Sequence, residues 1–291
     1  MSELVDHALY NLYSRGKSRV MFTVCIGFTA IIIALLVLVT GYLVAIGAGS
    51  ISLDFFTKLP IPADMPGYPG GMRHAIVGTL VLIGLASVVG VPLGMMSGVY
   101  LAEYSANSWL AAPTRFVADV LTGVPSIVVG VLGYELVVVP MGSYSGWAGA
   151  MALAFIMVPI VARTTEEMLL LVPNSYREAS IALGATKART IRTVVIPAAT
   201  GSIITGIMLA VARVAGETAP LLFTALGSNL LTFNPNHPFP SLTKQIFDYA
   251  SGPFPEQRRL AWAGILVLMF LIFVLNLTIR FFARSVRQRA A

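Results

Sequence analysis

The stretch HAIVGTLVLIGLASVVGVPLGMMSGVYLA, residues 74–102, contains no Asp, Glu, Lys or Arg. About 20 consecutive apolar residues suffice for a helix to cross a hydrocarbon core roughly 30 Å thick. Comparable uncharged runs occupy residues 20–53 and 260–279. These runs predict transmembrane helices, so the chain is expected to be an integral membrane protein.

The composition of the whole chain agrees with this. Of its 291 residues, 57% are hydrophobic and 11% are charged, against about 25% charged in soluble domains. The net charge of +6 does not indicate nucleic-acid binding, because the cations lie at the ends of apolar runs, where lipid headgroups explain them. The first run is too long for the apolar region of a signal peptide. A single cysteine, Cys25, excludes an internal disulfide and a thiolate metal cluster.

An all-α membrane fold with about six transmembrane helices is therefore predicted. The expected helices are residues 20–47, 74–102, 114–139, 147–171, 198–226 and 260–282, separated by Pro-rich, Gly/Ser-rich and polar loops. The expected organisation is a cytoplasmic tail at 1–19, a first helix with a Pro-rich outer loop at 20–73, a permease-like core at 74–284 and a basic cytoplasmic tail at 285–291.

The cation distribution predicts the orientation in the membrane. With the N-terminus inside, thirteen of the 19 Lys and Arg residues fall on the cytoplasmic side and five outside, while Arg213 lies within a span. This bias favours both termini in the cytoplasm. Arg258 and Arg259 fit less well, because they lie just outside the last span.

Residues 172–197, between the fourth and fifth expected spans, predict two short helices. Ser175 and Glu178 have the spacing of a capping box, Gly184 provides a left-handed helix stop, and Thr186 can cap a second helix. From physics alone, this hairpin is an amphipathic segment lying on the membrane surface.

A resemblance supplies an alternative. Glu178, Ala179 and Ser180, followed by Gly184 and by Val194, Ile196 and Pro197, resemble the EAA loop of bacterial ABC importer permeases, with Ser180 in place of the commonest third alanine. The resemblance implies the type I ABC importer permease fold. It also implies that residues 172–197 form a coupling helix that docks in a groove of an ATP-binding subunit.

Two further segments narrow the resemblance. LTGVPSIVVG at residues 121–130 and ARVAGETAPLLFTA at residues 212–225 are similar to phosphate-specific permeases of the PstA type. The resemblance implies a subunit of a phosphate importer in the bacterial cytoplasmic membrane. Its implied partners are a second homologous permease chain, two ATP-binding subunits that hold ATP and Mg, and an extracytoplasmic phosphate-binding protein.

Charges inside the expected spans need a physical reason, because a central charge costs about 2.5–3.5 kcal/mol on insertion-based scales. Arg213 and Glu217 are four residues apart and can pair on one helix face. That pair either stabilises helix packing or places Arg213 on a path for phosphate, whose oxygens suit the planar guanidinium fork. Arg163 is a second candidate for the path, or else a positive-inside anchor.

Other residues in the spans are assigned no chemistry. Asp119 and Glu135 are separated by 16 residues, or about 24 Å along a straight helix, near opposite membrane faces. Small residues at Gly84, Gly90, Gly94 and Gly98 predict close helix packing.

The sequence contains no Gly-x-x-x-x-Gly-Lys-Ser/Thr phosphate loop, so this chain is expected to be non-catalytic, with ATP hydrolysis supplied by a partner. An alternative is a permease of the same architecture for another oxyanion or solute. A more remote one is a membrane-embedded enzyme acting on lipid phosphates. The three histidines, His7, His74 and His237, show no metal-ligand spacing.

Overall fold

The computed structural model describes residues 2–105 and 108–290. Within these ranges all regular secondary structure is helical; the loops contain only isolated bridges that join Pro60 to Gly70 and Leu226 to Phe239. Met1 and Ala291, the ends of the two expected tails, lie outside the described residues. The all-α prediction is confirmed.

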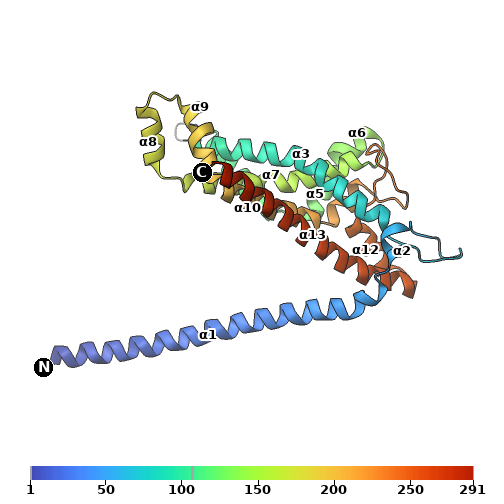
Figure 1. The fold of residues 1–291 in the computed structure, drawn as a ribbon, viewed down its shortest axis with the longest axis horizontal. Helices are drawn as coiled ribbons and strands as arrows, with labels where there is room; N and C mark the ends of the chain where they lie inside the picture. The colour runs from blue at the N-terminus through green and yellow to red at the C-terminus, as the bar shows by residue number, and fades with distance from the viewer. Residues whose placement is uncertain (1, 106–107, 291) are drawn as a thin grey trace.

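The N-terminal helix α1 (Ser2–Gly47) extends away from the other helices along most of its length, as Figure 1 shows. It returns to the bundle only near its end. There Gly47 lies against Leu266 and Trp262 of α13 (Pro255–Ala290), and the Tyr42 ring meets the Trp262 ring edge-on at 5.8 Å. A short turn η1 (Ala48–Ser50) and helix α2 (Leu53–Thr57) follow. Because most apolar side chains of α1 between Val20 and Ile46 are exposed, lipid or another protein must cover them.

The centre of the bundle is the pair α3 (Arg73–Glu103) and α7 (Gly146–Leu170). At Gly90, Gly94 and Gly98, an added Cβ would lie 2.6–3.1 Å from atoms of α7. The two backbones therefore approach as small-residue packing predicts. At Gly84 no atom of the described residues lies within 4 Å of such a Cβ, so no helix of this chain packs closely there, contrary to the expectation.

The third expected span is not one straight helix. It divides into α4 (Ala111–Gly123) and a second arm comprising α5 (Ser126–Gly133), the π-helical turn η3 (Tyr134–Val138) and α6 (Val139–Met141), with a bend of 107° between the arms. The break falls at Val124, whose ψ of 132° is extended. Pro125 excludes the preceding residue from the helical region and lacks an N–H donor. The 24 Å separation of Asp119 and Glu135 along one helix axis therefore does not apply.

The fifth expected span also differs. Helix α10 (Ile196–Ala215) stops at Gly216, and the short helix α11 (Ala219–Thr224) begins after Thr218 with Pro220 in its first turn. The expected helix from 198 to 226 is wrong because Gly216 and Pro220 bracket a turn. The expected polar loop at 227–259 contains another helix, α12 (Leu242–Ser251). Leu242 and Tyr249 bury one face of α12 against α3 and α13.

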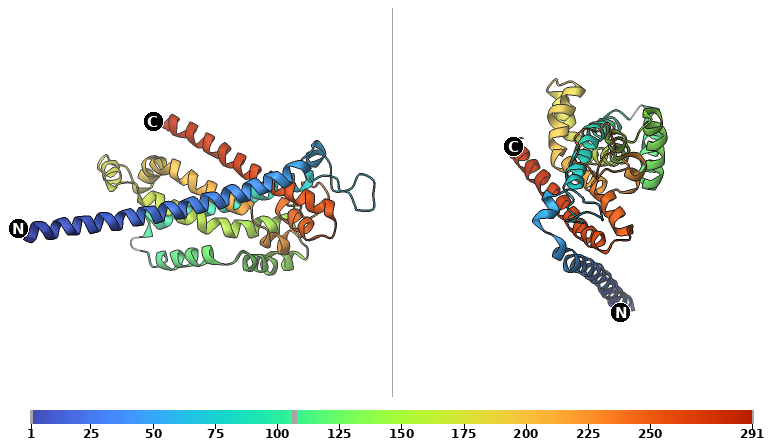
Figure 2. Two further views of the ribbon diagram at one scale, coloured as in Figure 1. Left: turned by 90° about the horizontal axis from the view of Figure 1, so that it is seen from below. Right: turned by 90° about the vertical axis from the view of Figure 1, so that its right-hand side faces the viewer.

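Between α7 and α10 the chain forms α8 (Asn174–Ala182), α9 (Lys187–Thr190) and the π-helical turn η4 (Ile191–Val195). In the described chain, five helices are long and apolar enough to cross a membrane, and the bent pair makes up to six. Figure 1 and the left-hand view in Figure 2 place the N-terminal end of α1, the C-terminal part of α13 and the α8–α9 segment toward one end of the molecule. Helices α2, α6 and α12 lie toward the other.

Candidate functional site

The α8–α9 segment projects from one end of the bundle (Figure 1). Gly184 has a φ of +86° between the two helices, and the Thr186 side chain accepts a hydrogen bond from the Arg189 backbone N–H. Both features match the sequence-based expectation. The predicted Ser175–Glu178 capping box is wrong: α8 begins at Asn174 after Pro173, without a side-chain cap. Proline at the cap position has a fixed backbone angle and starts the helix in its place.

The outer surface of α8 is uncovered in this chain. Glu178 and Ala179 are exposed, and so are Tyr176, Ile181 and Leu183, the last at 89%. Gly184 has no neighbouring atom within 4 Å of an added Cβ. An apolar group of this kind on a projecting helix is suited to insertion into a partner or a membrane surface.

The inner surface of α8 is fixed to the bundle by Arg177. Its guanidinium bonds to Glu103 at the end of α3, with Nη2 to Oε1 at 2.6 Å, and donates to the backbone carbonyls of Val172 and Leu169 at 2.6 and 2.9 Å. The side chains of Arg177 and Glu103 are only 17% and 5% exposed. This bidentate, largely buried contact links the orientation of α8 to α3 and α7.

Ser180 also connects α8 to the rest of the segment. Its hydroxyl lies 2.8 Å from that of Thr190, which is buried at the end of α9. The position that departs from the commonest alanine thus contributes a hydrogen bond between the two short helices. Ser180 faces inward, whereas Glu178 and Ala179 face outward.

We expect Arg177→Gln to loosen α8 without unfolding the bundle. Removing one partner of a buried, hydrogen-bonded ion pair costs about 3–5 kcal/mol, since the remaining charge is left unpaired. Hydrogen exchange should accelerate in α8 while the centre of α7 stays protected. Arg189→Gln, which removes an exposed cation from α9, is the matched control. Equal exchange in the two variants would contradict an anchoring role.

The Arg213–Glu217 pair forms, but across a helix end. Arg213 lies in the last turn of α10, and Glu217 lies in the turn before α11. Arg213 Nε and Glu217 Oε1 are 3.9 Å apart, with the two side chains 51% and 16% exposed. The guanidinium is thus held loosely by one carboxylate, and most of its donors are free among the described residues.

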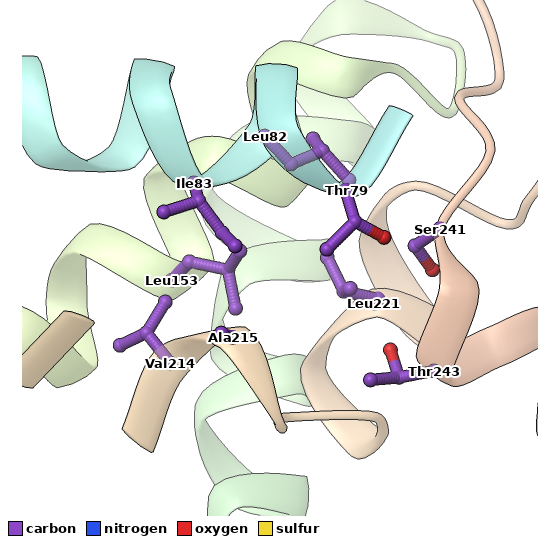
Figure 3. A pocket seen from close by; sticks show the side chains of 9 residues that line it. All are labelled: Thr79, Leu82, Ile83, Leu153, Val214, Ala215, Leu221, Ser241 and Thr243. Atoms are coloured by element: carbon purple, nitrogen blue, oxygen red, sulfur yellow. The ribbon is translucent and has the colours of Figure 1, made fainter. Parts of the chain in front are cut away.

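A small cavity of about 10 Å³ adjoins this helix break. Figure 3 shows the hydroxyls of Thr79, Ser241 and Thr243 together on one side of it, opposite the apolar side chains of α3, α7 and α10. Thr243 donates to the Glu217 carbonyl at 3.0 Å, and Thr79 accepts from the Leu242 N–H at 2.7 Å. The turn that carries Glu217 is therefore fixed by α12 and indirectly by α3.

Arg163 lies in a different environment from Arg213. On α7, it contacts Asp119 of α4 at 3.5 Å, Glu166 at 3.4 Å and Glu167 at 3.3 Å. Glu166 is itself buried and bonded to Arg115 Nε at 2.6 Å. The structure therefore brings Arg163 together with Asp119. Arg163 and Arg213 contact different carboxylates and do not form one site.

Sequence reasoning missed the Glu103–Arg177 and Arg115–Glu166 pairs. These arginines counted only as cytoplasmic cations, and no residue spacing links positions 74 or 51 residues apart. The one available signal was a carboxylate close to the end of an apolar run, which needs a partner when buried.

Glu135 is exposed on η3 and remains without an assigned role. The described residues contain no group of three or more potential metal ligands.

Known proteins resemble this chain in sequence and in architecture. Residues 90–288 match the family described as "Binding-protein-dependent transport system inner membrane component". The phosphate transport system permease protein PstA of Yersinia pestis is 49% identical over 234 residues, which cover 80% of this chain and 79% of that protein. The probable PstA of Methanocaldococcus jannaschii is 40% identical, with 73% and 75% covered.

An inward-facing structure of the MetNI methionine ABC transporter superposes with a TM-score of 0.59. Its identity is 21%, and 74% of this chain and 94% of that chain are covered. That likeness confirms the type I importer permease fold. The sequence relatives show that, within the permease family, this chain is of the PstA type. The chain belongs to the binding-protein-dependent transport system inner membrane components, as a multi-pass membrane permease of the PstA type.

Proposed function

We propose that this chain is the non-catalytic membrane permease subunit of an ATP-driven importer of inorganic phosphate. The observation that carries the proposal is Arg213, a half-exposed guanidinium within the fifth membrane segment, in a chain whose relatives are named as phosphate transport permeases. A permanent charge within a membrane-spanning helix is retained for a function or a partner. Its one carboxylate contact, at 3.9 Å, leaves donors for an anion.

The proposed partners are those that the resemblance to phosphate permeases implies, and each is matched below to a surface of the chain. Two ATP-binding subunits hydrolyse ATP with Mg, and one of them receives α8, with Glu178 and Ala179 at the contact and Gly184 at its end. A second homologous permease chain completes the transport path and covers apolar surface left open here. An extracytoplasmic phosphate-binding protein delivers the anion to the loops near α2, α6 and α12.

Arg213 is the primary residue proposed for the path. The break between α10 and α11 exposes its guanidinium at the end of a helix instead of burying it along a continuous one. Two parallel N–H donors can bind two phosphate oxygens. Glu217 orients the guanidinium from the neighbouring turn, which Thr243 fixes.

Arg163 is a secondary candidate with a stricter condition. Its three carboxylate neighbours already neutralise it, so an anion must displace Asp119 or Glu167 before it can bind. Both of these carboxylates are 54% exposed and can move, whereas Glu166 is 3% exposed and also bonded to Arg115. We infer that Arg163 meets phosphate only after the side chain of Asp119 or of Glu167 has moved away from it.

The direct test is uptake of labelled phosphate by the reassembled complex in vesicles, with sulfate and molybdate as competitors. ATP-dependent uptake that excess sulfate or molybdate does not reduce supports the proposal. Preferential uptake of either competitor would instead identify a permease for another oxyanion. If no ATP-dependent transport of any of these anions occurs with all partners present, the proposed function is wrong.

Both termini are expected in the cytoplasm. The Lys and Arg distribution supports this, and so does the common end shared by the N-terminus, α8–α9 and the C-terminal part of α13. Alkaline phosphatase fused after residue 291 should be inactive, because the enzyme requires export. An active fusion would contradict the orientation.

Glu217→Gln should weaken discrimination against sulfate. A protonated phosphate can donate a hydrogen bond to the carboxylate, whereas fully ionised sulfate cannot and is repelled. The measurement is the inhibition of phosphate uptake by sulfate, which should be stronger in the variant. Slower uptake with unchanged competition would leave Glu217 only the role of balancing the charge of Arg213.

A further inference from the structure

A second basic site lies away from the Arg213 region, at the end of the bundle near α9. A groove of about 470 Å³ opens between the final turns of α3 and the segment from α9 to the start of α10. It is lined by apolar and aromatic side chains with one cation: Met95, Met96, Val99, Tyr100, Tyr104, Ala188, Ile191, Arg192 and Ile196. No helix of the described chain covers Met96, which is 70% exposed.

The cations of this segment lack carboxylate partners. Arg115, Arg163 and Arg177 are all paired with glutamates. Arg192 and Lys187, by contrast, form no ion pair among the described residues. Lys187 Nζ lies 4.6 Å from the centre of the Tyr104 ring, which keeps its charge at the mouth of the groove. The nearby Glu103 is neutralised by Arg177.

The shape of the groove selects among possible occupants. From Tyr104 to Met95 it follows nine residues of α3, about 14 Å at 1.5 Å per residue. It therefore extends from the level of the headgroups, where tyrosine side chains gather, into the hydrocarbon. A water-soluble subunit reaches only the mouth of such a groove, whereas a lipid fills its whole length.

We propose that this groove binds one anionic phospholipid of the cytoplasmic leaflet. The phosphate accepts from Arg192 and lies near Lys187, while an acyl chain lies along Met95, Met96, Val99 and Ile196. Basic pockets between transmembrane helices bind anionic headgroups in this way. The N-terminal helix of a second copy of this chain would be a poorer occupant. Its Lys17 and Arg19 would be repelled by Arg192 and Lys187. Placing the groove in the cytoplasmic leaflet rests on the orientation given under the proposed function. Lipid binding in the groove does not depend on which solute the permease transports.

The test uses the delipidated complex with its partner subunits in detergent. Phosphatidylglycerol and phosphatidylcholine with the same acyl chains are titrated, and bound lipid is counted by native mass spectrometry. We expect one phosphatidylglycerol per permease chain to bind at least tenfold more tightly than phosphatidylcholine. Excess inorganic phosphate should not displace it, because phosphate lacks the acyl chain that occupies the groove. Equal binding of the two lipids, or displacement by phosphate, would overturn the proposal.

Arg192→Gln should weaken phosphatidylglycerol binding about fivefold, and Lys187→Gln by a comparable or smaller factor. Arg189→Gln is the matched control: it removes an exposed cation from the same segment, but Arg189 does not line the groove. These side chains are exposed, so folding should survive each change. A similar loss of phosphatidylglycerol binding in Arg189→Gln would show that the lipid is attracted to the basic surface in general. The proposed site in the groove would then be refuted.

A protein occupant is distinguished by labelling. In a Cys25→Ser background, Ala188→Cys, an exposed lining position beside Lys187 at the mouth of the groove, should react with maleimide in the assembled complex, and added phosphatidylglycerol should slow that reaction. Full protection before any lipid is added would show that a partner chain covers the groove, which would also overturn the proposal. Phosphate uptake is not the readout, so failure here leaves the proposed transport function intact.

Discussion

Replacing Arg213 by glutamine should reduce phosphate uptake by at least about 30-fold, corresponding to the 2 kcal/mol or more that a charge-assisted buried contact contributes. Glutamine retains similar length and some hydrogen bonding but loses the positive charge and the planar fork. Arg213→Lys should recover little, because an ammonium group acts as a point charge and lacks bidentate geometry. Uptake of radiolabelled phosphate, normalised to the amount of permease in the membrane, measures both effects.

The controls separate transport from folding. Arg213 is half exposed and its partner is 3.9 Å away, so the bundle should assemble without this charge. Membrane insertion, partner copurification and binding by the extracytoplasmic receptor should therefore be unchanged. Arg259→Gln provides a matched loss of arginine, since Arg259 is paired with Glu256 at 3.8 Å on the exposed start of α13. Near-normal uptake in Arg213→Gln would place the path elsewhere and leave the pair a packing role.

Ala179→Trp should uncouple the permease from ATP hydrolysis. Ala179 is exposed on the projecting helix α8, so an indole there extends from a surface that this chain leaves uncovered, where a partner would meet it. Overpacking a fitted contact costs about 1–3 kcal/mol, or roughly a five- to 150-fold weaker association. The ATP-binding subunit should copurify poorly, and ATP-dependent uptake should fall in proportion.

Ala250→Trp is the control for added bulk. Ala250 is also exposed but lies on α12, toward the opposite end of the molecule, so the ATP-binding subunits should stay attached. Retention of both attachment and transport in Ala179→Trp would refute the coupling-helix assignment. The membrane-surface hairpin would then be the better account of residues 172–197.

The sequence was most informative where one local signal decides the structure. Apolar runs near 20 residues must be helices in lipid, because each backbone polar group needs an internal partner there. Gly184 marked its turn because glycine adopts a φ of +86° without strain. Thr186 marked a cap because its hydroxyl reaches the N–H three residues on.

Local signals failed where two of them compete. Gly216 and Pro220 lie within an apolar run, and the hydropathy of the run favoured one helix over the break that the structure contains. Ser175 and Glu178 had capping spacing, yet Pro173 started the helix first. Helix α12 was hidden because only one of its faces is apolar, and its length of 10 residues is too short for a transmembrane pattern.

The sequence by itself predicted that this chain crosses a membrane, that residues 172–197 form two short helices, and that Arg213 lies within a span. Those properties depend on composition and on neighbours a few residues apart. Only the tertiary structure decided that Arg177 binds Glu103, that Arg163 is surrounded by carboxylates, and that Arg192 faces an open apolar groove. Contacts between residues 44 or 74 positions apart follow from how helices cross, and helix crossing depends on the summed packing of whole surfaces.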